Sequence, residues 1–229
     1  MPEEAVTNKG NLEMNVDIVY AIDVTGSMAP IIDTIKNSVK GFEKRLQNEL
    51  LSSTYQRQID ELRIRIVAFR DFDEDGQNSI NQSNFFTLPE EEEELYAYID
   101  KLEAFGGGDV PETAIDAFSI AMNSDWNTEG QKKRQIIFLF TDAPTKGPGH
   151  APKSLGLPST MEGVVEWWQD PQKSKLNRHA QRLIVYAPED ESWEFLEALD
   201  NTVWERSVPS EGLSEVGMDT ILALLCNSI

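Results

Sequence analysis

Short runs of apolar residues alternate along the chain with longer stretches in which apolar residues recur every three or four positions. The most apolar runs, residues 18–22 and 136–140, are uninterrupted, as expected when both faces of a parallel sheet are covered. The runs of strand length fall at residues 17–23, 62–69, 84–88, 135–141, 182–186 and 202–206. We therefore predict strands at these positions, with residues 84–88 at an edge of the sheet.

The stretches with a three- and four-residue repeat predict amphipathic helices that pack one apolar stripe on a sheet. They lie at residues 31–50, 90–102, 111–122, 193–199 and 213–225. Pro89 and Pro111 are expected at the start of two of these helices, where proline is tolerated. The alternation of strands and helices predicts an α/β fold. We expect a Rossmann-like, doubly wound, mostly parallel central sheet with one short antiparallel edge strand and helices on both faces.

Domain organisation follows from length and composition. Residues 1–14 are polar and acidic without periodicity, so we expect a flexible acidic N-terminal arm. A chain of 229 residues with 40% hydrophobic content can bury one sizeable core. We therefore predict a single domain over residues 15–229.

The charge of the chain excludes several classes of partner. Asp and Glu number 40 against 20 Lys and Arg, which gives a formal net charge of -20. This charge opposes binding to nucleic acid and to anionic membranes. We find neither a run long enough to span a bilayer nor a signal peptide at the start, and the single Cys226 cannot form an internal disulfide. We therefore expect a cytoplasmic protein.

Candidate chemistry stands at the end of the first apolar run. Asp23, Thr25 and Ser27 occupy alternate positions in a turn loosened by Gly26, so one carboxylate and two hydroxyls can converge. Ligands bind at the carboxyl edge of open α/β sheets. Oxygen ligands of this kind suit Mg²⁺, whereas Zn²⁺ would call for Cys or His. The sequence predicts a Mg²⁺ site here and leaves Mn²⁺ and Ca²⁺ open.

This stretch resembles the metal-ion-dependent adhesion site of von Willebrand factor type A domains, written Asp-x-Ser-x-Ser, with Thr25 in place of the first Ser. The resemblance implies two further segments, and both have candidates in the right order. The first is the glycine-rich loop at residues 106–112, where Asp109 replaces the Thr of many family members. The second is the apolar run that ends in Thr141 and Asp142.

The resemblance also implies a function, that of a metal-dependent protein-binding module and not an enzyme. The ion would keep one position for an acidic side chain of a partner protein. The implied metal-binding residues are Asp23, Thr25, Ser27, Asp109 and Asp142, with Asp71, Gly108 and Thr141 close around them. Because Asp109 adds a charge where relatives carry a neutral Thr, we expect a less electrophilic ion.

Two other interpretations stay open from the residues. The metal site could serve only to tie loops together in a scaffold domain. A phosphotransferase of the haloacid dehalogenase type also places an Asp at the end of its first strand, with Lys146 or Lys153 as its lysine. That chemistry needs a second acid two residues on, and here the residue is Thr25. Nucleotide binding is not expected, because the glycines at 106–108 match no phosphate-binding motif.

Overall fold

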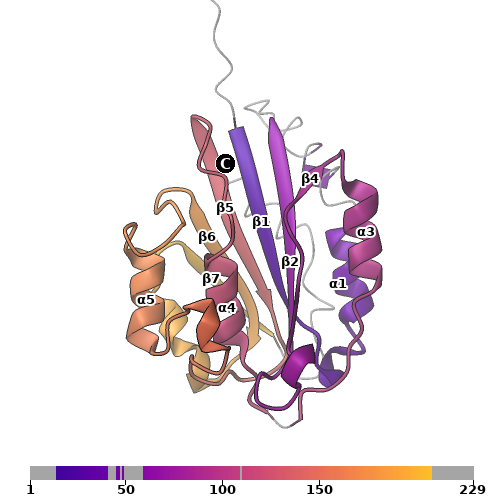
Figure 1. Ribbon diagram of the computed structural model, residues 1–229, viewed down its shortest axis with the longest axis vertical. Helices are drawn as coiled ribbons and strands as arrows, with labels where there is room; N and C mark the ends of the chain where they lie inside the picture. Colours follow the sequence, from indigo (N-terminus) through magenta and orange to yellow (C-terminus); the bar gives the residue numbers. More distant parts are fainter. Residues whose placement is uncertain (1–13, 41–44, 47, 49–58, 109, 208–229) are drawn as a thin grey trace, which may run out of the picture.

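The computed structural model describes residues 14–40, 45–46, 48, 59–108 and 110–207. Its centre is a twisted sheet of seven strands (Figure 1). The strands are β1 (Met14–Asp23), β2 (Glu61–Phe69), β3 (Ile80–Gln82), β4 (Phe86–Leu88), β5 (Lys132–Phe140), β6 (Gln181–Pro188) and β7 (Thr202–Ser207). Parallel pairing joins β2 to β1, β1 to β5, β5 to β6 and β6 to β7.

The strand order β3-β2-β1-β5-β6-β7 places the switch in winding direction next to β1. The chain passes from β1 to β2 on one side and later returns to β5 on the other. In open α/β sheets, the crevice at the carboxyl ends of such strands is where ligands bind. The ends of β1 and β5, at Asp23 and Phe140, meet at this point.

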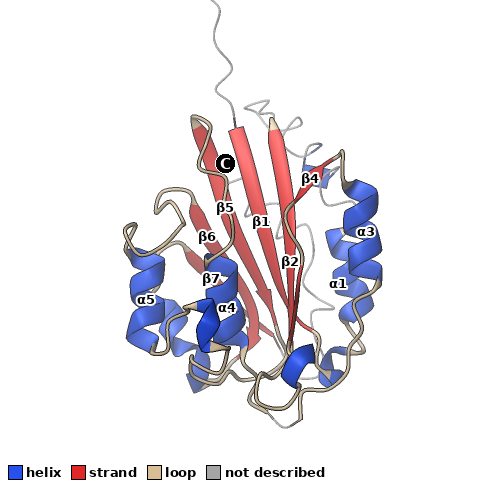
Figure 2. Cartoon of the chain, viewed as in Figure 1, coloured by secondary structure: helices blue, strands red, loops and turns tan. Residues whose placement is uncertain are grey.

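Helices cover both faces of the sheet (Figure 2). The α-helices are α1 (Ile32–Val39), α3 (Glu92–Asp100), α4 (Ala114–Met122) and α5 (Met161–Gln169). In Figure 1, α1 and α3 lie on one face, and α4 and α5 lie on the other. No helix in the described part of the chain is long and apolar enough to cross a bilayer.

The core has two layers because successive side chains of a strand point to opposite faces. On β1, Ile18, Tyr20 and Ile22 join the apolar cluster under α1 and α3. Val19 and Ala21 join the cluster under α4 and α5. Both clusters are needed to bury a central parallel strand, which explains the uninterrupted apolar run. The predicted fold class is confirmed.

The edge of the sheet differs from the expectation in one respect. β4 pairs antiparallel with β2, as predicted, but β3 also pairs antiparallel with β2. β3 was not predicted because its three residues, Ile-Asn-Gln, are too few to show an alternating pattern.

Two predicted helix starts are wrong by about one turn, for reasons that involve distant contacts. α3 begins at Glu92, not at Pro89, because Glu91 and Thr87 exchange hydrogen bonds that close a turn on β4. α4 begins at Ala114, after Pro111, because the backbone of Glu112 bonds to Pro144 and Lys146. Tertiary contacts therefore set these helix boundaries.

Other predicted elements need shorter comments. β5 begins at Lys132, so the basic residues before position 135 belong to the strand. The segment predicted as a helix at 193–199 is a 3-10 helix, Glu191–Ala198. Most of the second half of the predicted helix at 31–50, and all of the predicted helix at 213–225, lie outside the described residues.

Candidate metal centre

Asp23 is the last residue of β1, and its side chain is fully buried. One carboxylate oxygen accepts the backbone N–H of Thr25 at 2.8 Å and the hydroxyl of Thr25 at 2.7 Å. The other accepts the hydroxyl of Thr141 at 2.6 Å. Burial raises the pKa of Asp23 to about 6, although these three hydrogen bonds act in the opposite direction and favour the charged form. A nearby cation would stabilise that charge.

The hydroxyls of Thr25 and Ser27 lie side by side at the same strand end. The hydroxyl of Thr25 donates to Asp23, and the hydroxyl of Ser27 donates to Asp142 at 2.9 Å. A hydroxyl has one hydrogen and two lone pairs, so both oxygens keep lone pairs free. The two oxygens are 3.2 Å apart. Adjacent ligands of an octahedral Mg²⁺ ion, each 2.0–2.1 Å from it, are about 2.9 Å apart.

The segment after β5 closes the other side of the site. Thr141 and Asp142 follow the strand directly, and the parallel pairing of β5 with β1 brings them beside Asp23. Thr141 is buried and is held by its bond to Asp23, while Asp142 is half-buried and reaches Ser27. The structure therefore brings together five of the predicted residues from two segments more than 110 positions apart.

The glycine-rich loop lies against the first turn through two backbone hydrogen bonds. The N–H of Gly26 donates to Gly106 at 3.1 Å, and the N–H of Phe105 donates to Val24 at 3.0 Å. Gly107 has φ +95°, which L side chains rarely adopt. A Cβ there would lie 2.7 Å from the Cβ of Thr25. Glycine is needed for this close approach.

Glu112 is a buried acid at this site to which the sequence analysis assigned no role. It is 4% exposed, and its Oε2 has no hydrogen-bond partner among the described residues. Its Oε1 would lie 2.8 Å from a Cβ on Gly107, which also approaches Thr25. Glu112 therefore lies near the hydroxyls of Thr25 and Ser27, which we call the hydroxyl cluster. The signal in the sequence was an acid at the end of the glycine-rich loop, just before a helix.

The charge on Glu112 is unfavourable in this position. Burial raises its pKa to about 8, and the charges of Asp23, Asp71 and Asp75 raise it too. Lys146 acts in the opposite direction. A cation that binds nearby compensates the unfavourable charge of an acid that is buried among other acids without a hydrogen-bond partner.

The remaining predicted residues have other surroundings. Asp71 is fully buried, and its carboxylate pairs with the ammonium of Lys146 at 2.6 Å, which ties the loop after β5 to the end of β2. Gly108 lies in the glycine-rich loop, where a Cβ would approach the side chain of Glu74. Asp109 lies outside the described residues.

The donor set at this edge is rich in oxygen. Within the described residues, no three His, Cys, Asp or Glu side chains converge closely enough to hold an ion by themselves. An ion at this site would therefore depend on the hydroxyls of Thr25 and Ser27 as well as on carboxylates. Such a mixture of neutral and charged oxygens fits a hard divalent cation.

Comparison with known proteins gives relatives with the same architecture. Alpha-protein kinase vwkA of Dictyostelium discoideum is 21% identical over 160 residues, which cover 66% of this chain and 23% of that protein. The chain therefore spans less than a quarter of this curated relative.

Two solved structures share the fold at 12% sequence identity. The pilus adhesin SpaC of Lactobacillus rhamnosus GG has a TM-score of 0.55, over 96% of this chain and 31% of that one. The vWF domain of the type V pili tip protein Mfa5 of Porphyromonas gingivalis has a TM-score of 0.51, over 96% of this chain and 97% of that one.

The family model of the von Willebrand factor A domain matches residues 17–154. The match begins in β1 and extends past Asp142, so it includes the turn after Asp23, the glycine-rich loop and the segment after β5. Since it covers more than half of the chain, this protein belongs to the von Willebrand factor A domain family.

Proposed function

We propose that this von Willebrand factor A domain is a metal-dependent protein-binding module. Asp23, Thr25, Ser27 and Asp142 would hold a divalent cation, Mg²⁺ in the first instance, with Asp109 as a further acid from the glycine-rich loop. The cation would supply an electrophilic centre with an open position for an acidic side chain of a partner protein.

The arrangement of the two hydroxyls is the observation that carries this proposal. Each gives its single hydrogen to a carboxylate, so lone pairs stay free on both oxygens. The oxygens of Thr25 and Ser27 are 3.2 Å apart, close enough to bind one cation together. Glu112, buried without a hydrogen-bond partner for Oε2 among the described residues, is a further acid near them. We propose that it contacts the ion through water.

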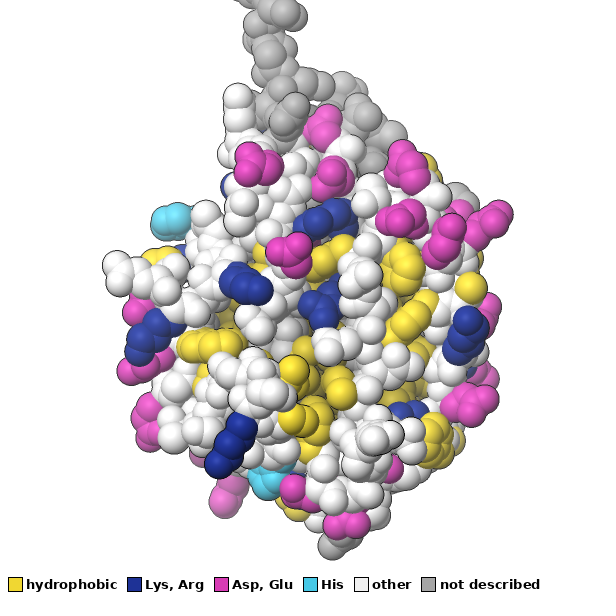
Figure 3. All heavy atoms as spheres, in the orientation of Figure 1, with side chains coloured by type: hydrophobic (Ala, Val, Ile, Leu, Met, Phe, Trp, Pro, Cys, Tyr) yellow, Lys and Arg dark blue, Asp and Glu magenta, His cyan; other side chains and the backbone are white. Residues whose placement is uncertain are grey.

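The surface around the site suits a protein partner. Phe105, just before the glycine-rich loop, and Val110, within it, are 44% and 63% exposed. Exposed aromatic and aliphatic side chains beside a charged centre are typical of protein contact surfaces. Figure 3 shows acidic side chains gathered over α3, while Lys and Arg are scattered over the face in view. This distribution favours a protein over a polyanion as the partner.

Two contacts speak against a phosphotransferase. The residue two positions after Asp23 is a threonine whose hydroxyl donates to that carboxylate, so it provides no general acid. The ammonium of Lys146 is held by Asp71 and Asp73, at 2.6 and 2.8 Å. We therefore propose a binding function without catalysis. The proposal also includes a single domain over residues 15–229 and a cytoplasmic location.

Calorimetric titration of the chain with Mg²⁺ and Mn²⁺ tests the metal site. We expect saturable binding to the wild type and a loss of about a hundredfold in Ser27→Ala, which removes one hydroxyl ligand. Ser27 is exposed, so the variant should keep its fold. Ser154→Ala is the matched control because Ser154 is exposed in the 3-10 helix Lys153–Leu155, outside the hydroxyl cluster.

The same titration then separates a binding module from a scaffold. The metal-loaded chain is titrated with a short peptide that contains one Asp, and with the same peptide carrying Asn. Weak, metal-dependent binding of the Asp peptide alone supports the proposed partner chemistry. Metal binding without any preference for Asp supports the scaffold interpretation, and no metal binding to the folded wild type contradicts the proposal.

A further inference from the structure

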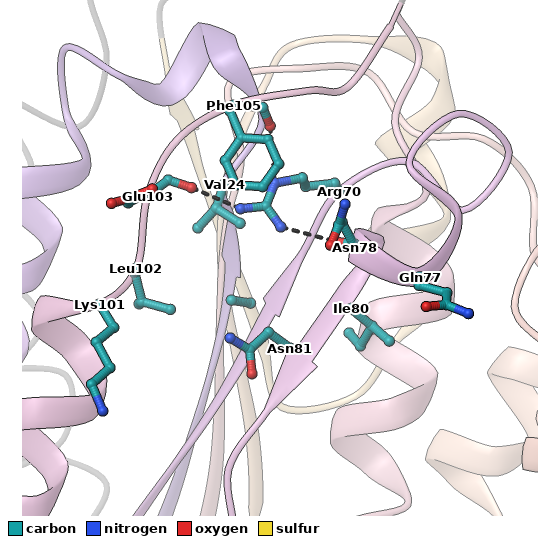
Figure 4. A pocket seen from close by; sticks show the side chains of 11 residues that line it. Val24, Arg70, Gln77, Asn78, Ile80, Asn81, Lys101, Leu102, Glu103 and Phe105 are labelled. Carbon is teal, nitrogen blue, oxygen red and sulfur yellow. Dashed lines mark hydrogen bonds between the residues drawn. The ribbon is translucent and has the colours of Figure 1, made fainter.

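A pocket of about 240 Å³ lies beside the metal centre, on the side of the sheet that α1 and α3 cover (Figure 4). We call it the Arg70 pocket. Its wall is formed by the ends of β1 and β2, by β3 and by the segment after α3. Val24, Ala68, Leu102 and Ile80 supply apolar surface. The pocket is separate from the hydroxyl cluster, since Asp23, Thr25 and Ser27 do not line it.

Arg70 lines this pocket, and the residue as a whole is only 6% exposed. Its three nitrogens donate to backbone carbonyls of Phe105, Asn78 and Glu103, at 2.9, 2.8 and 2.7 Å. The ring of Phe105 stacks on the guanidinium, with 3.7 Å from Cζ to the ring centroid. Figure 4 shows the guanidinium beside the ring of Phe105. The group is fixed in position and orientation.

The hydrogen bonds of Arg70 leave part of its donor capacity unused. A guanidinium has five N–H groups, and three are accounted for by the carbonyls. The other two meet no acceptor among the residues that the structure describes. They belong to the two terminal nitrogens, because Nε has a single hydrogen and donates it to Phe105. One remains on each terminal nitrogen, and two donors on neighbouring nitrogens can bind both oxygens of one oxyanion.

The charge of Arg70 is balanced without a direct ion pair, by the nearby carboxylates of Asp75, Asp23 and Glu103, which favour its charged form. No carboxylate of the described residues forms an ion pair with it, whereas Arg63 on the same strand makes a bidentate pair with Asp17. Burial lowers the pKa of Arg70, which reflects the cost of a charge removed from water. A monovalent anion in the pocket would offset that cost.

The size and polarity of the pocket define the class of anion. Its volume lies below the range of about 300–1,000 Å³ for sites of drug-sized ligands. The apolar wall suits a short hydrocarbon tail. One buried positive charge matches one negative charge, and Figure 4 shows the ammonium of Lys101 pointing away from the guanidinium. The carboxylates of Asp75, Asp23 and Glu103 repel any anion here, and they repel a phosphate, with nearly two charges, more strongly than a monocarboxylate.

We propose that the Arg70 pocket is a binding site for a small monocarboxylic acid. Its carboxylate would accept the two remaining N–H groups of Arg70, and its short apolar tail would lie against Val24, Ala68 and Leu102. Asn81 is exposed and lines the pocket from β3; its side-chain oxygen accepts the hydroxyl of Tyr98 at 2.7 Å, so its amide N–H groups would face the ligand. This site does not require a metal ion.

The test is a titration of the full chain with sodium butyrate in a buffer that contains a chelator. Chloride is exchanged for butyrate at constant ionic strength, and the Nε–Hε resonance of Arg70 is followed by NMR. We expect a saturable shift with a dissociation constant of about a millimolar, typical of a ligand with few atoms. Inorganic phosphate should bind on the order of tenfold more weakly. Since the chelator removes divalent ions, the result is independent of the metal centre.

Two matched variants test the position of the ligand. Asn81→Asp places a negative charge in the pocket without a change of size, and it should weaken butyrate by about tenfold. Asn84→Asp makes the same change at an exposed position outside the pocket and should leave the affinity unchanged. A shift that does not saturate, phosphate binding as tight as butyrate, or equal behaviour of the two variants would overturn the proposal.

Discussion

The metal centre and the Arg70 pocket lie on opposite sides of one short segment. Among the residues that the structure describes, the metal centre has hydrogen-bond acceptors without partners, and the Arg70 pocket has donors without partners. Val24 lines the pocket, while its neighbours Asp23 and Thr25 belong to the metal centre. The metal centre presents oxygen lone pairs and buried carboxylates. The Arg70 pocket presents N–H groups and a positive charge. Elsewhere, as at Asp17 and Arg63, opposite charges pair directly. Ligand sites are expected where the fold leaves such groups unpaired.

The largest expected effect is that of Gly107→Ala, which would disrupt the metal centre. A Cβ at this position, with φ +95°, would meet Thr25 and Glu112 within 2.8 Å. We expect a loss of about 3 kcal/mol in the free energy of unfolding, measured by urea denaturation with chelator, together with a loss of metal binding. Gly147→Ala is the control, since a Cβ there meets nothing within 4 Å. Equal stability of the two variants would show that the close approach is not essential.

Arg70→Lys is the corresponding change in the pocket. The lysine keeps the charge but loses the three N–H groups that donate to backbone carbonyls. We therefore expect a loss of about 2 kcal/mol in the free energy of unfolding. Arg178→Lys, at an exposed pair with Asp200, should cost about 0.5 kcal/mol or less. Urea denaturation checks both. Similar losses in the two variants would mean that the hydrogen bonds of the buried guanidinium stabilise the fold no more than a surface ion pair does.

Glu112→Gln should separate stability from metal binding. The buried acid lies near three other carboxylates, so its removal should raise the free energy of unfolding by about 1 kcal/mol in chelator. The same change should weaken Mg²⁺ by about tenfold if Glu112 orders water around the ion. Glu162→Gln, at an exposed position on α5, is the control. A destabilised variant would contradict the idea of an uncompensated acid.

The smallest expected effect is that of Thr25→Ser, which keeps the hydroxyl and removes a buried methyl group. We expect a loss of about 0.8 kcal/mol in stability and little change in metal affinity. Thr25→Val keeps the methyl group and removes the hydroxyl that donates to the buried carboxylate of Asp23, so it should abolish metal binding and cost about 1–3 kcal/mol in stability. Calorimetry and denaturation of this pair decide between the hydroxyl and the methyl group as the important feature. Unchanged metal affinity in Thr25→Val would exclude the hydroxyl as a ligand.

The metal centre could be predicted further from the sequence than the pocket because of where its residues stand. Asp23 and Thr141 each follow an apolar strand, and parallel strands end at one edge, so local pattern and topology suffice to bring them together. Glu112 was missed because its burial depends on the glycine-rich loop and on backbone bonds to the segment after β5.

The Arg70 pocket gave no signal in the sequence. Two of its carbonyl partners lie 33 and 35 positions away, and carbonyls occur at every residue, so no residue type marks them. The same limit applies to Asp71, whose ion pair with Lys146, 75 positions away, was not predicted. Contacts between backbone groups and distant side chains are set by tertiary structure alone.

The hydrogen bonds between the first turn and the glycine-rich loop have an entropic consequence. Glycine loses more conformational freedom on ordering than any other residue. Gly106 accepts the N–H of Gly26, and Gly107 donates to Asp75 at 2.9 Å, so contacts within the protein hold these residues in place. Folding therefore bears the entropy loss of ordering them. Ion binding should then be accompanied by little ordering of this part of the backbone, and its measured entropy should be dominated by the release of water from the cation.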